Sequence, residues 1–181
     1  MKKILASFVL VALSSTASAI HPALEAISAS SQGNPASTAK PASEVLFAST
    51  LNDSNDKPVA LERYRGKALV VNFWARWCAP CRQEIPELAK FARSHKGKIE
   101  VLGIGIEDKA EPVREFAARN GMDYPVFIAG DKGIPLMQNL GNTVGGLPFT
   151  LFINAKGQVV GRKVGMLKAA DLDAAAPLLA K

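Results

Sequence analysis

Apolar and polar positions follow one another along this chain in blocks that predict strands and helices in turn. The continuous apolar runs at 68–74 (ALVVNFW) and 99–106 (IEVLGIGI) have strand length and are typical of strands buried on both faces. Apolar residues at helical spacing follow each run and predict helices over 80–95 and 111–121. The later part of the chain predicts a short strand at 124–129, a short helix at 134–141, strands at 149–153 and 158–165, and a closing helix at 167–180.

Two stretches predict antiparallel hairpins. Residues 45–50 (VLFAST) and 57–61 (KPVAL) flank the turn sequence NDSND, and Asn154–Gly157 forms a tight turn between two later strands. The strands that alternate with helices predict parallel pairing instead. A mixed central sheet flanked by helices on both faces satisfies both patterns, so the sequence predicts an α/β fold.

The first residues have the three-part layout of a secretory signal peptide. Lys2 and Lys3 precede a mostly apolar run, which is followed by the small residues Ala17-Ser18-Ala19. The apolar run is short for a membrane span, which takes about 20 residues. We therefore expect a signal peptide over 1–19, cleaved after Ala19, and a periplasmic protein. The alternative is an uncleaved segment that anchors the protein in the inner membrane, facing the periplasm.

The composition changes after the signal. Residues 20–43 are rich in Ala, Ser and Pro, contain no aromatic residue and show no sustained periodicity, which predicts a flexible linker. Residues 44–181 have the commonest size of a single domain and can bury a core without cysteine staples. The sequence therefore predicts one folded domain over 44–181.

The charge pattern argues against a nucleic-acid binder. The formal net charge is +6 for the full chain, and loss of Lys2 and Lys3 with the signal leaves 20 basic and 16 acidic residues. The basic residues are mixed with acidic ones and not gathered in a stripe interleaved with aromatic residues. An ordinary solvated surface explains the pattern.

The only two cysteines, Cys78 and Cys81, stand in the stretch FWARWCAPCR. A structural disulfide closing so small a ring stabilises a fold by only about 2 kcal/mol on the loop-entropy estimate. Zinc takes three or four protein ligands, and the chain has only two cysteines and two histidines, of which His21 lies in the predicted linker. Haem attachment requires a histidine after the second cysteine, where Arg82 stands. A redox-active dithiol fits better than these alternatives.

The position of the pair supports redox chemistry. A buried strand ends at Trp74, and a helix begins near Cys81. Cys78 should lie at the helix N-terminus, where free N–H groups and the helix dipole favour a thiolate. Cys81 lies one turn further and should be the more buried thiol. An exposed thiolate that attacks and a buried thiol that resolves are what thiol-disulfide exchange needs.

Over residues 44–181 the chain resembles the thioredoxin superfamily, in particular its exported TlpA/ResA-like branch. The resemblance rests on GKALVVNFWARWCAPCRQEIPEL, on VLGIGIED and on GGLPFTLFINAKGQVVGRKVG. It implies a thioredoxin fold with an N-terminal β-hairpin and a central helix-strand insert, which residues 111–128 match.

The resemblance also implies roles for single residues. Cys78 and Cys81 would form the redox-active disulfide. Pro148 matches the family's cis-proline, and the backbone of Leu147 before it would pair with the bound substrate chain. Trp77, just before the first cysteine, would flank the surface on which the partner docks.

Other positions would support the dithiol. Pro80 and Pro86 lie in the active-site helix, with Pro86 at the place of the family's kink. Asn72 stands where cytoplasmic thioredoxins carry a buried Asp, and it cannot act as a base. The family branch uses an acid after the next strand, which matches Glu107, with Asp108 as the alternative. A carboxylate there would take the proton of Cys81.

The predicted function is a thiol-disulfide oxidoreductase that reduces exported client proteins carrying disulfides, such as those of cytochrome c or copper-site assembly. The resemblance implies re-reduction by a membrane electron donor, and we expect a monomer without cofactor or metal. Two alternatives stay open: a dithiol oxidase and a non-catalytic copper-binding module. A peroxidase would want Thr three residues before Cys78, where Ala75 stands. The methionines that a copper site would use are spread out and predict core packing: Met122, Met137 and Met166.

Overall fold

The computed structural model describes residues 41–107 and 109–181. The predicted signal peptide and residues 20–40 of the predicted linker lie outside the described residues. The helices are α2 (Ala42–Phe47), α3 (Ala79–Ser94), α4 (Ala110–Arg119), α5 (Gly133–Asn139) and α6 (Ala169–Leu179), with short 3-10 turns η1 (Leu61–Tyr64) and η2 (Gly130–Lys132). The strands are β1 (Thr50–Asp53), β2 (Pro58–Ala60), β3 (Ala68–Trp74), β4 (Ile99–Gly105), β5 (Val126–Ile128), β6 (Phe149–Ile153) and β7 (Val159–Val164).

The strands form one mixed sheet in the order β2-β1-β5-β4-β3-β6-β7. The central strands β3, β4 and β5 run parallel, whereas β6 and β7 on one side and β1 and β2 on the other pair antiparallel. The predicted α/β fold is confirmed, including the N-terminal hairpin. The predicted insert is also present, as α4 and β5.

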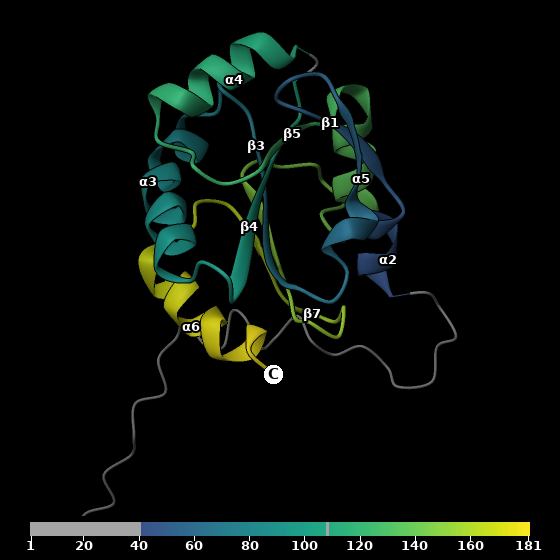
Figure 1. Ribbon diagram of the computed structural model, residues 1–181, viewed down its shortest axis with the longest axis vertical. Coiled ribbons are helices and arrows are strands. Elements are labelled where there is room, and N and C mark those ends of the chain that lie inside the picture. Colours follow the sequence, from purple (N-terminus) through teal and green to yellow (C-terminus); the bar gives the residue numbers. More distant parts are fainter. Residues whose placement is uncertain (1–40, 108) are drawn as a thin grey trace, which may run out of the picture.

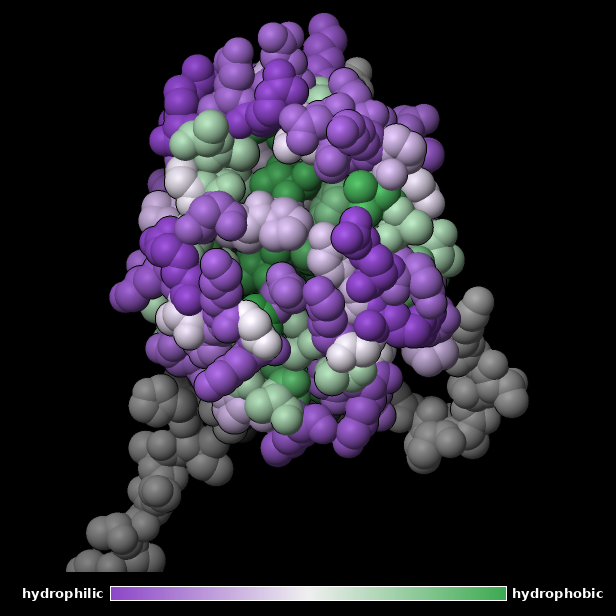
Figure 2. Space-filling view, in the orientation of Figure 1, coloured by the Kyte–Doolittle hydropathy of each residue, from purple (hydrophilic) through white to green (hydrophobic). Residues whose placement is uncertain are grey.

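Helices cover both faces of the sheet (Figure 1). One core lies between the sheet and α3, α4 and α6, and it includes both cysteines. A second core lies on the opposite face, under α2 and α5. Figure 2 shows apolar side chains in the middle of one face of the molecule, with polar side chains around them. Because β3 is buried along its whole length, its continuous apolar run is needed to fill both cores.

The prediction of a strand over 45–50 is wrong. Residues Ala42–Phe47 form α2, and the first strand begins only at Thr50. A short apolar run cannot be assigned to helix or strand by periodicity alone. The tertiary contacts decide here, because Leu46 and Phe47 are both buried in the second core while Val45 is left 37% exposed.

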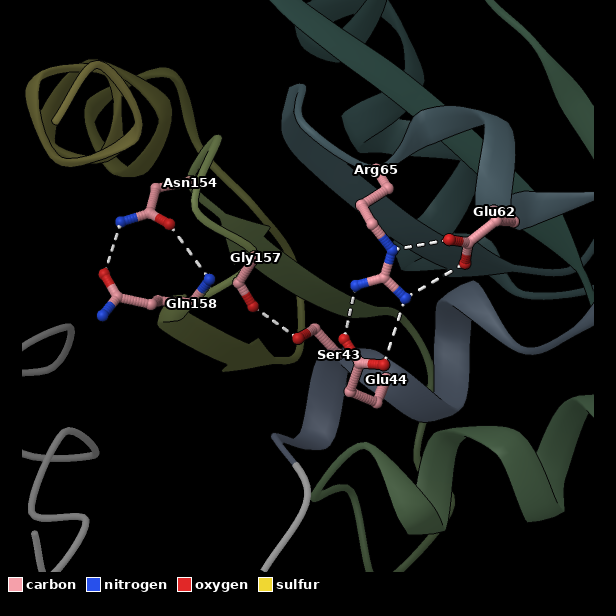
Figure 3. A network of polar contacts seen from close by, with 7 residues as sticks. All are labelled: Ser43, Glu44, Glu62, Arg65, Asn154, Gly157 and Gln158. Atoms are coloured by element: carbon pink, nitrogen blue, oxygen red, sulfur yellow. Dashed lines mark hydrogen bonds and ion pairs between the residues drawn. The ribbon is translucent and has the colours of Figure 1, made fainter.

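Polar contacts hold α2 against the rest of the domain (Figure 3). The buried Ser43 hydroxyl donates to the carbonyl of Gly157, in the turn between β6 and β7. The guanidinium of Arg65 bonds to the carboxylates of Glu44 and Glu62. The side chain of Asn154 closes the same turn by accepting from the backbone N–H groups of Lys156 and Gln158. These contacts make α2 part of the folded domain.

Replacing Ser43 with alanine is expected to lower the free energy of unfolding by about 1–2 kcal/mol, because the partly buried hydrogen bond to the Gly157 carbonyl is lost. Denaturant unfolding should show a lower midpoint with an unchanged slope. Ser49→Ala is the matched control, since the Ser49 hydroxyl donates to Val45 on the surface at 2.8 Å. Equal midpoints for the two variants would contradict the docking of α2.

Candidate functional site: a disulfide at the start of helix α3

The two cysteines form a disulfide at the first turn of α3. Cys78 is the N-cap of this helix, as predicted, and its sulfur accepts the backbone N–H of Cys81 at 3.3 Å. Pro80 lies within the first turn, where a missing N–H costs no helical hydrogen bond. The turn therefore directs helical N–H groups toward Cys78, which favours negative charge on its sulfur after reduction.

The two sulfurs differ in access. Cys78 is 5% exposed and Cys81 is 0% exposed in the disulfide form. The order is the predicted one, although Cys78 is more covered than expected for an exposed thiol. Of the two cysteines, Cys78 is therefore the one that an incoming thiol is expected to reach first.

The tryptophans on either side of the turn have different environments. Trp77 is 69% exposed beside Cys78, while Trp74 is fully buried and stacks on Phe116 at 5.3 Å. Both placements match the prediction. An exposed indole next to the accessible sulfur offers a partner protein a large apolar contact.

The start of β6 lies at the same edge of the sheet as the disulfide, because Phe149 pairs with Phe73 near the end of β3. The Leu147–Pro148 peptide just before β6 is cis, as predicted. Leu147 packs against the core cluster that contains both cysteines. Its backbone N–H and carbonyl make no hydrogen bond to other backbone groups in the described part of the chain. Both groups are therefore open to an added strand.

Apolar side chains near this loop reach the surface. Val144 and Val164 are 81% and 54% exposed. Both side chains lie close to Gly146, because a Cβ atom added to this glycine would be within 3.8 Å of each. The prediction that Met166 packs in the core is wrong, since it is 36% exposed. Met166 stands in the loop after β7, directly after Gly165, whose N–H bonds the Pro148 carbonyl at 2.8 Å. The loop after β7 is therefore hydrogen-bonded to the cis-proline.

A buried glutamate lies one helical turn after Cys81. Glu84 is 1% exposed, and its carboxylate accepts from Asn72 Nδ2 at 2.7 Å and from the backbone N–H of Leu167 at 2.6 Å. Burial raises the pKa of Glu84 to about 7, against the opposing effect of these two hydrogen bonds. Residues three apart on a helix have Cβ atoms about 5–6 Å from each other. Glu84 and Cys81 are therefore neighbours on the buried side of α3, one helical turn apart.

The sequence did contain a signal for Glu84. It stands between Cys81 and Ile85 on the apolar stripe of α3, where the helical spacing calls for an apolar residue. Asn72 stands where the resemblance places a buried Asp in cytoplasmic thioredoxins. Here its side chain binds a different buried acid, because Asn72 Nδ2 donates to the Glu84 carboxylate and also to the Thr150 hydroxyl at 3.0 Å.

Glu107, the acid predicted from the resemblance, has a different partner. Its side chain is 11% exposed, and its carboxylate pairs with Arg76, accepting from Nε at 3.0 Å and from the backbone N–H at 3.2 Å. Asp108 lies outside the described residues. The catalytic role of Glu107 stays a prediction.

Pro86 stands inside α3, where it cannot donate to the helical ladder, and the kink predicted there stays a prediction. Among the described residues, no three His, Cys, Asp or Glu side chains come together as a group able to hold a metal ion. In the same part of the chain, no helix combines the length and apolar character needed to cross a membrane.

A disulfide at the first turn of the helix that follows a central parallel strand, with a cis-proline beside it at the same sheet edge, defines a thioredoxin-fold protein with a redox-type cysteine pair. A family model described as Redoxin matches residues 29–176, which is more than half of the chain. The chain therefore belongs to the redoxin family.

The chain is also similar to individual proteins named as thiol-disulfide oxidoreductases. The chain is 31% identical over 111 residues to the thiol-disulfide oxidoreductase ResA of Bacillus subtilis, covering 61% of this chain and 60% of that protein. It is 30% identical to ResA of Geobacillus kaustophilus, covering 68% of this chain and 69% of that protein. A thiol:disulfide interchange protein from Chlorobium tepidum has a similar structure, with a TM-score of 0.65 and 28% identity over 74% of this chain and 93% of that chain.

Proposed function

We propose that the protein is a periplasmic thiol-disulfide oxidoreductase that reduces disulfides of exported client proteins. The observation that carries the proposal is the Cys78–Cys81 disulfide at the start of α3, in which Cys78 caps the helix and Cys81 is the more buried of the two residues. The similarity to ResA-type oxidoreductases supports it.

In the proposed reaction the Cys78 thiolate attacks one sulfur of the client disulfide. A mixed disulfide forms, and the first client sulfur leaves as a thiolate that takes a proton from solvent. The Cys81 thiol then gives its proton to Glu84, and the resulting thiolate attacks the Cys78 sulfur. The second client sulfur leaves and takes the proton back from Glu84. The client gains two electrons and two protons, and the Cys78–Cys81 disulfide is restored.

The surface around Cys78 supports binding of an extended client segment. Trp77 offers an exposed indole, and the open backbone groups of Leu147 allow the client to add as a short strand. Val144 and Val164 would contact apolar client side chains beside the disulfide. The docking surface is thus apolar, which suits clients that are not fully folded.

The proposed compartment is the periplasm, and the proposed electron supply is a membrane donor. The predicted signal peptide supports export, and each reduced client leaves an oxidised dithiol in an oxidising compartment. Two electrons must return to the dithiol in each cycle, and in this proposal a membrane electron donor supplies them. Clients in cytochrome c or copper-site assembly fit this proposal, and so does a monomer that meets each client alone.

The reduction potential tests the direction of electron flow. We expect a reduction potential of about −270 mV and a dithiol that is mainly reduced in the living cell, because a reductase must give its electrons to client disulfides. The measurement is equilibration with glutathione buffers, together with acid-quenched alkylation of whole cells. A potential near about −120 mV would support a dithiol oxidase instead. Stoichiometric copper retention without insulin reduction would support the copper-binding alternative.

A further inference from the structure

A short turn between β3 and α3 carries the exposed Trp77. The turn spans residues 75–77 and joins the fully buried Trp74 at the end of β3 to Cys78 at the start of α3. Because Trp77 is 69% exposed, packing against the rest of the domain contributes little to the position of its indole. The backbone of the turn must therefore set where Trp77 stands relative to Cys78.

The carboxylate of Glu107 binds this turn with both of its oxygens. One oxygen accepts the backbone N–H of Arg76 at 3.2 Å, and the other accepts Arg76 Nε at 3.0 Å. The side chain of Glu107 is only 11% exposed, and hydrogen bonds to an ionised acceptor are about twice as strong as those between neutral groups. Within the turn, the N–H of Cys78 donates to the carbonyl of Ala75 at 3.2 Å. Hydrogen bonds therefore fix the backbone on both sides of Trp77.

The backbone around Glu107 is itself held by neighbouring elements. The carbonyl of Glu107 accepts from the N–H of Gly130 in η2 at 3.1 Å. Ile106, just before it, donates to the carbonyl of Trp74 at 3.1 Å. Ile106 also lies against the start of α5, because a Cβ atom added to Gly133 would be 2.8 Å from its Cγ2. A carboxylate on a backbone held in this way can fix the turn that it binds.

We propose that Glu107 is a positioning residue that holds the turn at 75–77 and thereby strengthens the binding of the client. The client then meets an indole that is already in place beside Cys78, and less conformational entropy is lost on binding. Protonation of Glu107 would weaken both of its bonds to Arg76 and release the turn, so this holding role differs from that of a proton acceptor. The inference rests on the proposed function, which assigns Trp77 to the surface that binds the client.

Glu107→Ala tests the hold on the turn, because it removes both hydrogen bonds to Arg76. The readout is the steady-state reduction of insulin by the full chain, with an excess of a chemical dithiol as the electron source. KM is expected to rise about tenfold, the effect of losing about one hydrogen bond to a charged group, while kcat stays within about twofold. A binding interaction that is equally strong before and in the transition state changes KM and leaves kcat unchanged.

Arg76→Ala separates the backbone bond from the ion pair. It keeps the backbone N–H that Glu107 accepts and removes a guanidinium whose side chain is 39% exposed, so KM is expected to rise only about twofold. The double variant Arg76→Ala/Glu107→Ala should match Glu107→Ala. Glu100→Ala is the matched control. Glu100 pairs with Lys67 at 3.4 Å at the opposite end of β4, and its loss should leave KM unchanged.

Fluorine NMR of the protein labelled with 5-fluorotryptophan gives a readout that does not depend on activity. The chain contains two tryptophans, so two resonances are expected, and Trp77→Phe assigns them. In Glu107→Ala the resonance of Trp77 should shift or change its width, because the turn that carries it is released. The resonance of the buried Trp74 should keep its position and so show that the core is still folded.

The two measurements separate the possible failures. An unchanged Trp77 resonance in Glu107→Ala would overturn the hold on the turn, and an unchanged KM would overturn its effect on client binding. A lower kcat with an unchanged KM and an altered pH–rate profile would support a proton acceptor instead. An equal rise of KM in Arg76→Ala would assign the effect to the ion pair and overturn the role of the backbone bond. If the unmodified protein fails to reduce insulin, the proposed function fails, while the Trp77 resonance still decides whether Glu107 holds the turn.

Discussion

Cys81→Ser is expected to trap client proteins as mixed disulfides with Cys78 and to abolish turnover. Cys78 is the more exposed of the two cysteines, and it caps α3, where helical N–H groups stabilise its thiolate. Without the second thiol, the mixed disulfide has no internal route to resolution. Non-reducing gels of acid-quenched cells should show covalent adducts that a reducing agent releases.

Cys78→Ser is the matched control, because it keeps one thiol in the same helical turn. The remaining Cys81 is fully buried and should capture almost no client. Comparable trapping by both variants would overturn the assignment of Cys78 as the nucleophile. Trapping by neither would weaken the redox function itself and strengthen the copper-binding alternative.

Glu84→Gln is expected to slow the resolution of the mixed disulfide by about 10²-fold at neutral pH, the low end of the usual range for general acid–base catalysis. The amide cannot take the proton of Cys81, while most of the shape of Glu84 is kept. Resolution should also lose the pH dependence that its carboxyl imposes. The measurement is the single-turnover rate of client-thiol release over a range of pH.

Glu107→Gln is the comparison for this prediction. Glu107 pairs with Arg76 at the edge of the site, so the change should leave the pH–rate profile close to that of the unmodified protein. If Glu107→Gln altered the profile and Glu84→Gln did not, the acid predicted from the resemblance would be the functional one.

Glu84 also gives the stability of the protein a pH dependence of known sign. The pKa of Glu84 is about 7 in the folded protein, above the value of 4.5 for an unperturbed carboxyl. Folding therefore favours the protonated form of Glu84. The stability that this form contributes to the folded protein is complete below pH 4.5 and is lost as the pH rises through about 7. The difference is on the order of 3 kcal/mol. Unfolding free energies measured at pH 5 and pH 8 should show this loss in the unmodified protein and not in Glu84→Gln.

The core elements could be predicted from the sequence because their signals are local. The fully apolar run of β3 and the helical spacing along α3 each occupy one continuous stretch and indicate one type of structure. The Cys-Ala-Pro-Cys stretch lies between this strand and this helix, so its place at the start of the helix could be predicted as well. The cis peptide before Pro148 followed from resemblance to a family and could not be obtained from spacing.

The failures came from segments whose local signal was ambiguous. The short apolar run at 45–50 has no clear period, and only its burial against the second core makes α2 a helix. Met166 has an apolar side chain, but it stands in the loop after β7 and so reaches the surface. Burial depends on neighbours that are distant in sequence, and these neighbours cannot be identified from a single short stretch.

By itself the sequence determined the order of strands and helices from β3 onward, the pair of cysteines and their place at a helix start, because each depends on residues close together in the chain. Only the tertiary structure decided which carboxyl lies beside the dithiol. Glu84 is held by Asn72 from β3 and by the backbone of Leu167, which is 83 residues away. Its shifted pKa arises from burial among these elements, and burial exists only once the sheet and helices have packed together.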